Sequence, residues 1–311
     1  MKNKIYIISL SPSLDYIVKF DNLKIGETNR PIETEIYAAG KGIHMSMLLN
    51  NIGVDNESIV FTNGEFESFF YNDLDKIGIK YKKFPSEGDI RINLKLIDDN
   101  QTECSAKSPM ILEENIERLF NYLEKNVNPN DYVIAAGSVP QGVDSDIYAR
   151  IVNKVNNLKA FCVIDAFGEA LNNAIKERPF LIKPNKTELE LTTGIKINSE
   201  TDLIKAAEKL LHEGVKNVLI SMGEEGAVFI NETTKVKCEI GSWNKKLVNA
   251  AGAGDSMMAG FVAKWIETND IEASLKNGII CGSATAFSNK IATHNLIKEL
   301  ESASTLKVEK L

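Results

Sequence analysis

The chain has 311 residues, 43% of them hydrophobic, and a formal net charge of −7, which is ordinary for an acidic globular protein. An acidic chain is not expected to bind nucleic acid or anionic membranes in general, so an anionic ligand would need a local cluster of Lys and Arg. The four scattered cysteines and three histidines argue against a disulfide framework and a zinc site, and are typical of reduced, cytoplasmic proteins. The apolar runs at 5–10 and 279–287 are too short for a signal peptide or a membrane span.

Short apolar runs alternate with helical patterns along most of the chain. In chain order, the runs predicted as strands are 5–10, 59–61, 132–136, 161–164, 180–182 and 218–221. The stretches predicted as helices are 42–51, 66–77, 111–123, 147–155, 201–212 and 279–287. Short apolar strands separated by helices indicate an α/β fold, with a mainly parallel sheet covered by helices on both faces.

A second group of strands does not follow this alternation. Residues 90–97 alternate between apolar and polar, 98–100 can form a turn, and 102–106 can return. Residues 14–20 and 33–38 are also strand-like, with no helix between them. We expect a small antiparallel sheet that stands off the main one. An exposed sheet face is unusual unless it covers something or pairs with another subunit.

The glycine-rich segment 252–256, Gly-Ala-Gly-Asp-Ser, leads into a helical run. The first amides of a helix have no intrahelical acceptor and favour an anion, so this turn is a potential phosphate site. Asp255 has two interpretations: it caps the helix, or it takes a proton from a hydroxyl group while the amides of 253–255 hold a phosphoryl group.

Two segments near the N-terminal half also allow two interpretations. Residues 39–42, Ala-Gly-Lys-Gly, open the first long helix and are either a simple turn or a close backbone approach to a ligand, with Lys41 available for a phosphate. Arg91 lies in the alternating strand, where it is either a solvated edge charge or a guanidinium that binds a phosphate.

Two further segments follow predicted strands. In 181–188, Asn185 and Glu188 share one helical face and form either a capping box or a Mg²⁺ site, since Mg²⁺ needs few protein ligands. In 218–229, Gly223 and Gly226 form either a plain β-turn or a turn over which a nucleotide phosphate lies.

Taken in order, these motifs resemble the ribokinase-like sugar kinases of the PfkB type, most closely the 1-phosphofructokinase and tagatose-6-phosphate kinase branch. The resemblance covers essentially the whole chain and is carried by residues 11–15, 26–30, 40–43, 91–93, 137–140, 183–185, 188, 221–223 and 252–256. It implies a three-layer sandwich with a β-sheet lid. We expect one catalytic domain over 1–311, with lid segments at about 13–20, 33–39 and 89–107.

The resemblance also implies a role for each site residue. The catalytic group is Asp255 as general base, with Gly252, Ala253 and Gly254 around the phosphoryl group. The residues expected to bind the sugar phosphate are Asp15, Arg30, Gly40, Lys41, His44, Arg91 and Ser138. Lys183, Ser221, Gly223 and Gly226 are expected to bind the nucleotide, and Asn185 and Glu188 to hold Mg²⁺ through water.

Three positions depart from the family pattern. Ala39 replaces the first glycine of a Gly-Gly pair, which predicts a stiffer hinge, and Ala136 replaces a common serine. His44 stands where an asparagine normally contacts the sugar phosphate; alternatively it packs among Met45 and Met47 and touches no ligand.

The activity expected from the resemblance is ATP- and Mg²⁺-dependent phosphorylation of a ketohexose monophosphate, foremost fructose 1-phosphate to fructose 1,6-bisphosphate. The alternatives are a tagatose-6-phosphate kinase and a non-catalytic sugar-phosphate sensor. The expected partners are the sugar phosphate, ATP and a second copy of the chain bound through the lid, with no nucleic acid or membrane.

Overall fold

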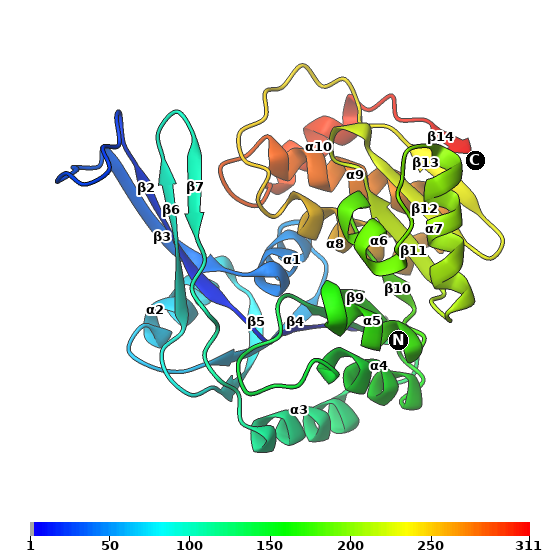
Figure 1. The fold of residues 1–311 in the computed structure, drawn as a ribbon, viewed down its shortest axis with the longest axis horizontal. Helices are drawn as coiled ribbons and strands as arrows, with labels where there is room; N and C mark the ends of the chain where they lie inside the picture. Colours follow the sequence, from blue (N-terminus) through cyan, green and yellow to red (C-terminus); the bar gives the residue numbers. More distant parts are fainter. Residues whose placement is uncertain (1–2) are drawn as a thin grey trace.

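The structure is a computed structural model and describes residues 3–311. A ten-stranded main sheet runs through the molecule in the order β14-β13-β12-β11-β10-β9-β8-β1-β4-β5. A four-stranded small sheet, in the order β3-β2-β6-β7, projects to the left of the helices in Figure 1. The small sheet consists of β2 (Ser13–Lys19), β3 (Glu33–Ala39), β6 (Arg91–Ile97) and β7 (Gln101–Cys104).

The strands of the main sheet form two unequal parts. The parallel part contains β5 (Lys80–Pro85), β4 (Asn56–Thr62), β1 (Ile5–Ser9), β8 (Tyr132–Ala136), β9 (Phe161–Asp165), β10 (Leu181–Ile182) and β11 (Asn217–Ser221). The antiparallel part adds β12 (Ala227–Asn231), β13 (Lys235–Cys238) and β14 (Val308–Lys310) to β11. The predicted α/β class with a mostly parallel sheet is confirmed. The β13–β14 edge was not predicted, because both strands are short.

Helices cover both faces of the main sheet. One face is covered by α3 (Glu113–Asn126), α4 (Ile147–Asn157), α5 (Gly168–Lys176), α6 (Lys186–Thr193) and α7 (Glu200–His212). The other is covered by α1 (Lys41–Asn51), α8 (Ala253–Thr268), α9 (Ile271–Ala286) and α10 (His294–Ser302). Within β1, Tyr6 and Ile8 pack into the first core while Ile5 and Ile7 pack into the second, because side chains alternate along a strand. Strands buried on both faces read as continuous apolar runs, which is why they were predictable.

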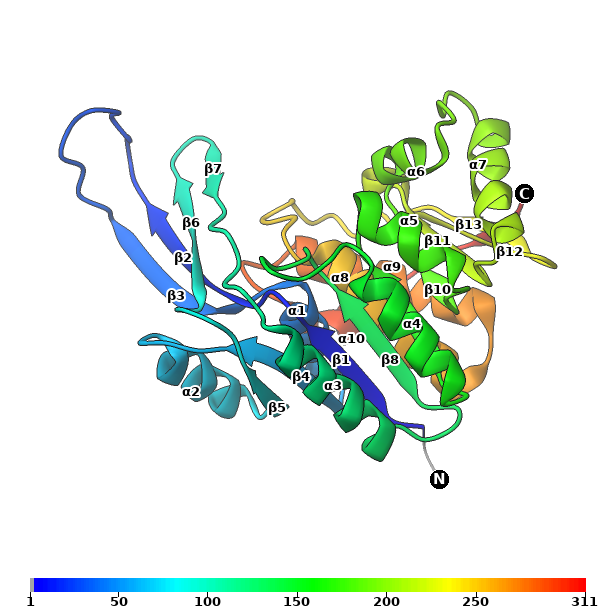
Figure 2. The same ribbon diagram turned by 60° about the horizontal axis from the view of Figure 1, so that its bottom comes forward.

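The small sheet is antiparallel in two of its three pairings, β2–β3 and β6–β7, while β2 and β6 pair in parallel. The chain leaves this sheet after β3, forms α1, β4, α2 (Glu67–Ile77) and β5, and returns as β6. Apolar residues of α2, including Phe70 and Leu74, pack with Leu14 and Ala38 at the base of the small sheet. In Figure 2 the tips of β2, β3, β6 and β7 extend well beyond the helices.

Two expectations about the class of protein can be compared with the structure. Among residues 3–311, no helix combines the length and the apolar character needed to cross a membrane. All four cysteines are free: Cys104 is exposed, and Cys162, Cys238 and Cys281 are buried.

Candidate active site

Many of the predicted site residues lie at one edge of the main sheet, where the parallel strands end. Asp165 ends β9, Lys183 follows β10 and Ser221 ends β11. Backbone hydrogen bonds join these ends: the Gly137 N–H donates to the Asp165 carbonyl oxygen (3.0 Å) and the Ser221 N–H to that of Pro184 (3.1 Å). Open α/β sheets bind ligands at this edge, so the fold brings segments that are far apart in the sequence to one place.

Asp255 lies in the first turn of α8, which begins at this edge. Gly252 is the N-cap residue, with φ of 79°, a conformation that favours glycine. The Ser256 N–H donates to the Gly252 carbonyl oxygen at 2.8 Å as the first helical bond. Gly252 rather than Asp255 therefore occupies the cap position, and the buried Asp255 carboxyl group is not used as a cap.

The Asp255 carboxylate contacts two side chains of α1. His44 Nδ1 lies 2.8 Å from Oδ2, and Lys41 Nζ lies 3.7 Å from Oδ1. Burial acts to raise the pKa of Asp255, but the hydrogen bond with His44 and the charge of Lys41 outweigh burial, and the pKa is lowered. Asp255 is therefore ionised at neutral pH. In the described part of the chain only one of its two oxygens is hydrogen bonded.

His44 makes a contact that neither sequence interpretation included. The family pattern predicted a contact with the sugar phosphate, and the alternative was packing among Met45 and Met47. Instead, the ring is hydrogen bonded to Asp255, while Met45 points into the core of the α1 face.

The start of α8 offers fewer amides than the sequence predicted. The Ala253 N–H donates to the Ala250 carbonyl oxygen at 3.2 Å, which leaves the amides of Gly254 and Asp255 for an anion. A Cβ atom built on Gly254 would lie 3.4 Å from Lys183 Nζ. An anion at this turn would therefore meet two amides and one ammonium group.

Asp165 is a site residue that the sequence analysis missed. Its buried carboxylate bridges two predicted lysines, with Lys41 Nζ 3.1 Å from Oδ1 and Lys183 Nζ 3.4 Å from Oδ2. Burial acts to lower the pKa of Lys41, but the charges of Asp165 and Asp255 outweigh burial and raise it, so Lys41 remains cationic. The available signal was an acidic residue at the end of a buried apolar strand, where an unpaired charge is rare.

Asp15 forms a second buried group, on β2 of the small sheet. Lys95 Nζ lies 2.8 Å from Asp15 Oδ2, and Asn93 Nδ2 and Ser13 Oγ donate to Oδ1 at 3.0 and 3.1 Å. Asp15 and Asn93 are direct neighbours in the β2–β6 register. The sequence identified Asp15 but not Lys95, because a lysine in an alternating strand is normally exposed.

Arg91 and Ser138 lie near this group, but Arg30 does not. The Arg91 guanidinium donates to the carbonyl oxygens of Ser11 (3.0 Å) and Ala106 (3.2 Å), and burial lowers its pKa. It is therefore not a solvated edge charge. The Ser138 hydroxyl donates to Ser11 Oγ at 3.3 Å. Arg30 is exposed in the loop between β2 and β3, and Figure 2 shows this loop at the far end of the small sheet.

Two predicted ligand glycines have close contacts with the protein's own backbone. Gly40, with φ of 113°, is the N-cap residue of α1, and a Cβ atom there would lie 3.2 Å from Pro12 Cα. A Cβ atom on Gly226 would lie 2.1 Å from the Cys238 carbonyl oxygen. Both positions need glycine for packing, whatever ligand they meet. Gly223 begins the short 3-10 turn Gly223–Glu225.

Asn185 and Glu188 form the capping box that the sequence left open. The Glu188 N–H donates to Asn185 Oδ1, and the Asn185 N–H donates to Glu188 Oε2, both at 2.8 Å. No group of three or more His, Cys, Asp or Glu side chains in residues 3–311 is arranged to hold a metal ion. A capping box does not exclude the Mg²⁺ interpretation, because Glu188 Oε1 is outside the pair and Mg²⁺ keeps several of its waters.

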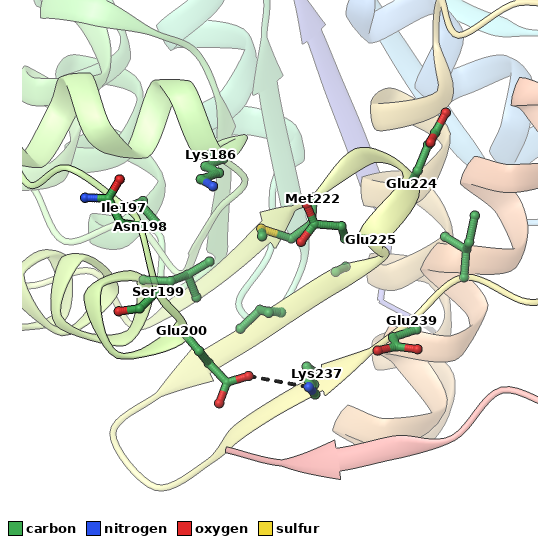
Figure 3. A pocket seen from close by; sticks show the side chains of 14 residues that line it. Lys186, Ile197, Asn198, Ser199, Glu200, Met222, Glu224, Glu225, Lys237 and Glu239 are labelled. Atoms are coloured by element: carbon green, nitrogen blue, oxygen red, sulfur yellow. Dashed lines mark ion pairs between the residues drawn. The ribbon is translucent and has the colours of Figure 1, made fainter.

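A hollow of about 470 Å³ adjoins the predicted nucleotide loop from the α7 side (Figure 3). Glu224 and Glu225 of the 3-10 turn line it together with Lys186, and Glu200 and Lys237 form a 3.4 Å ion pair across its wall. Four glutamates and two lysines line the hollow. This excess of negative charge disfavours a phosphate group, so the α8 turn is the better phosphate site.

Comparisons with known proteins show the family of the chain. Residues 5–296 match the model of the pfkB family carbohydrate kinases. A 1-phosphofructokinase of Borreliella burgdorferi is 35% identical over 95% of this chain and 96% of its own length. A D-tagatose-1-phosphate kinase of Bacillus licheniformis is 30% identical over 91% and 93%. The crystal structure of phosphofructokinase-2 from Escherichia coli with substrates and products has a TM-score of 0.91, at 21% identity, over 96% of this chain and 99% of that one. At that identity the likeness concerns the fold alone.

Proposed function

Because the chain belongs to the pfkB family of carbohydrate kinases, we propose that it transfers the γ-phosphoryl group of ATP to a ketohexose monophosphate. The substrate is fructose 1-phosphate, and the products are fructose 1,6-bisphosphate and ADP. The observation that carries the proposal is the Asp255 carboxylate, which is ionised, buried and hydrogen bonded through one oxygen only, at a helix start flanked by Lys41 and Lys183.

In the proposed reaction, Asp255 Oδ1 takes the proton of the sugar hydroxyl group. The hydroxyl oxygen forms a bond to the γ-phosphorus, the bond from that phosphorus to the β–γ bridging oxygen breaks, and ADP leaves. The amides of Gly254 and Asp255 hold the transferring group, and Lys183, close to Gly254, neutralises part of its charge. Positioning and charge neutralisation account for most of the rate in phosphoryl transfer.

The small sheet provides the proposed sugar site. Asp15 accepts hydrogen bonds from sugar hydroxyls, with Lys95 and Asn93 holding its orientation. Arg91, whose guanidinium lies against Ser11, is the proposed contact to the phosphate already on the sugar. The lysine of the first helix, Lys41, is paired with Asp165 and Asp255, so we assign it to the transferring group rather than to the sugar phosphate.

Mg²⁺ is the proposed cofactor, held through water by Asn185 and Glu188. Their oxygens suit a hard cation. They lie beside Ser221, because Asn185 and Ser221 form an isolated parallel β-bridge. When bound, Mg²⁺ would neutralise charge on the ATP phosphates. Ser221, Gly223 and Gly226 are the proposed nucleotide contacts.

A second candidate substrate is tagatose 1-phosphate, since one relative carries that name. It differs from fructose 1-phosphate in the configuration of one hydroxyl group, so Asp15 and its partners are the groups that would discriminate the two sugars. Tagatose 6-phosphate and a non-catalytic role are the further alternatives.

A coupled ADP-release assay tests the proposal. The panel contains fructose 1-phosphate, fructose 6-phosphate, tagatose 1-phosphate and tagatose 6-phosphate, each with and without excess EDTA. We expect the highest kcat/KM for fructose 1-phosphate and loss of turnover with EDTA. ADP release no faster than with ATP alone, for every sugar, would leave the sensor as the better account.

We also propose that 1–311 forms one catalytic domain that acts in the cytoplasm as a homodimer through the small sheet. The exposed apolar residues Tyr16, Ile25 and Ile32 on this sheet and its loop support the dimer, since exposed sheet faces and edges attract partners. Light scattering at micromolar concentration with sugar phosphate should give twice the chain mass of 34.4 kDa; the mass of one chain would contradict the dimer.

A further inference from the structure

The hydrogen bond between His44 and Asp255 links two helices that are far apart in the sequence. His44 comes from the first turn of α1, and Asp255 from the first turn of α8. Their side chains are 13% and 8% exposed. A polar contact this well buried is stronger than one in water, because little solvent competes for either partner.

The surrounding atoms hold the ring in place. A Cβ atom on Gly252 would lie 3.4 Å from His44 Nδ1 and 2.7 Å from Ile291 Cδ1. Gly252 therefore leaves free the space that a side chain would fill between Ile291 and the Nδ1 edge of the ring. Nδ1 is the nitrogen that faces Asp255, and its hydrogen bond to Oδ2 leaves Oδ1 as the other carboxylate oxygen.

We propose that His44 is a positioning residue for phosphoryl transfer, which holds Asp255 Oδ2 so that Oδ1 faces the acceptor hydroxyl and which weakens the base when the ring is protonated. The inference rests on the proposed function, in which Asp255 is the base. It assigns to His44 a role on the base in place of the sugar-phosphate contact that the sequence predicted.

The protonation state of the His44 ring sets the direction of the expected pH effect. With a neutral ring, the Nδ1 hydrogen is donated to Oδ2, and the carboxylate keeps its ability to accept a proton at Oδ1. A ring that has taken up a second proton is cationic; it stabilises the carboxylate charge and makes proton uptake at Oδ1 less favourable. Turnover should therefore rise with pH as the ring loses that proton.

Charged and titratable groups face His44 from several elements. On the side of the base they are Asp255, Lys41 and Lys183. The other side of the ring lines a hollow of about 210 Å³, whose titratable groups are Tyr37, Asp73, Lys76, Lys95 and Lys290. The ring therefore lies between the base on one side and a hollow with both acidic and basic groups on the other.

The test compares kcat from pH 5.5 to 9 for the parent, His44→Asn and His44→Ala, at saturating ATP, Mg²⁺ and fructose 1-phosphate. Saturation removes the titration of the sugar phosphate itself from the comparison. An asparagine amide can still donate to Oδ2 but cannot become charged near neutral pH.

At pH 8, His44→Ala should lower kcat roughly 10- to 100-fold, with the KM for ATP within about twofold of the parent, because only the geometry of the base is lost. His44→Asn should recover most of this loss. Between pH 8 and pH 6, kcat should fall roughly three- to tenfold more for the parent than for His44→Asn. His294→Asn, the same substitution at an exposed histidine of α10, is the matched control and should keep the parent profile.

A different kinetic result would contradict each part of the proposal. Parent-like kcat and pH profile in both His44 variants would overturn the inference while leaving the kinase intact. Full turnover in Asp255→Asn would instead contradict the assignment of Asp255 as the base. No turnover in the parent would contradict the proposed function. If His44→Ala does not fold, as judged by circular dichroism, the pH profile of His44→Asn still decides.

Discussion

Asp15 and Asp255 are both buried carboxylates at the proposed site, yet their surroundings differ. Asp15 lies between strands of the small sheet, where Lys95 binds one oxygen and Asn93 the other. Asp255 lies at a helix start, where His44 binds one oxygen, while the nearest cation to the other, Lys41, is 3.7 Å away. Strands present a row of fixed neighbours, whereas the first turn of a helix leaves space in front of it.

This difference separates binding from chemistry. A carboxylate with both oxygens occupied is a fixed acceptor of known direction, suited to recognising hydroxyl groups. A carboxylate with one oxygen unoccupied can take a proton without first breaking a bond, which suits a general base. The following variants test whether the two carboxylates have these separate roles, in order of decreasing effect.

Asp255→Asn should lower kcat by roughly 10²- to 10⁴-fold while the fold and both KM values stay close to those of the parent, because the amide has the same shape but cannot accept the proton. Steady-state kinetics and a thermal melt measure this. Turnover within about twofold of the parent would show that Asp255 has no proton to take.

Lys95→Met should lower the free energy of unfolding by roughly 3–5 kcal/mol, because it leaves Asp15 buried without its cation. Urea titration measures the loss. Lys19→Met is the matched control: it breaks the exposed 2.7 Å pair with Glu33 in the same sheet and should cost only about 0–1 kcal/mol. Equal losses would mean that the Asp15 pair behaves as a surface pair.

Asp165→Asn should lower kcat by roughly tenfold or more, because Lys41 and Lys183 would lose the carboxylate that holds both of them at the site. Asp165 contacts the two lysines that are assigned to the transferring phosphoryl group. The KM for fructose 1-phosphate should therefore change less than kcat. A change confined to that KM would place Asp165 on the sugar side.

Arg91→Ala should raise the KM for the sugar phosphate by roughly tenfold and leave the KM for ATP nearly unchanged, because the guanidinium is the proposed contact of the sugar phosphate only. Arg30→Ala, in the exposed loop of the small sheet, is the comparison. Within one subunit it should raise the KM for the sugar phosphate less than Arg91→Ala does. Equal increases in both KM values for Arg91→Ala would contradict its place at the sugar.

The sequence predicted the parts of the fold that are buried on two faces. The strand Tyr132–Ala136 was predicted with its observed bounds, because each of its residues is apolar and buried. The strand Lys80–Pro85 was missed, because an edge strand carries lysines on its open side and so lacks an apolar run.

The same reasoning explains which site residues could be found. Asp255 could be predicted because a glycine-rich helix start is a local pattern with a chemical meaning. Asp165 gave only a weak local signal, a carboxylate at the end of a buried apolar strand, and one of its two lysine partners, Lys41, is more than 70 residues away. Lys95 gave none, because its partner Asp15 lies on another strand far away in the sequence. The contact of His44 with Asp255 likewise depends on how α1 and α8 pack, and no local pattern encodes it.

Gly40 joins the two regions that this comparison separates. It lies between the end of β3 and the start of α1, and a Cβ atom there would come within 3.2 Å of Pro12 Cα, just before β2. Lys41 and His44 follow within four positions, and both contact Asp255. A substitution at Gly40 is therefore expected to disturb the small sheet and the surroundings of Asp255 together.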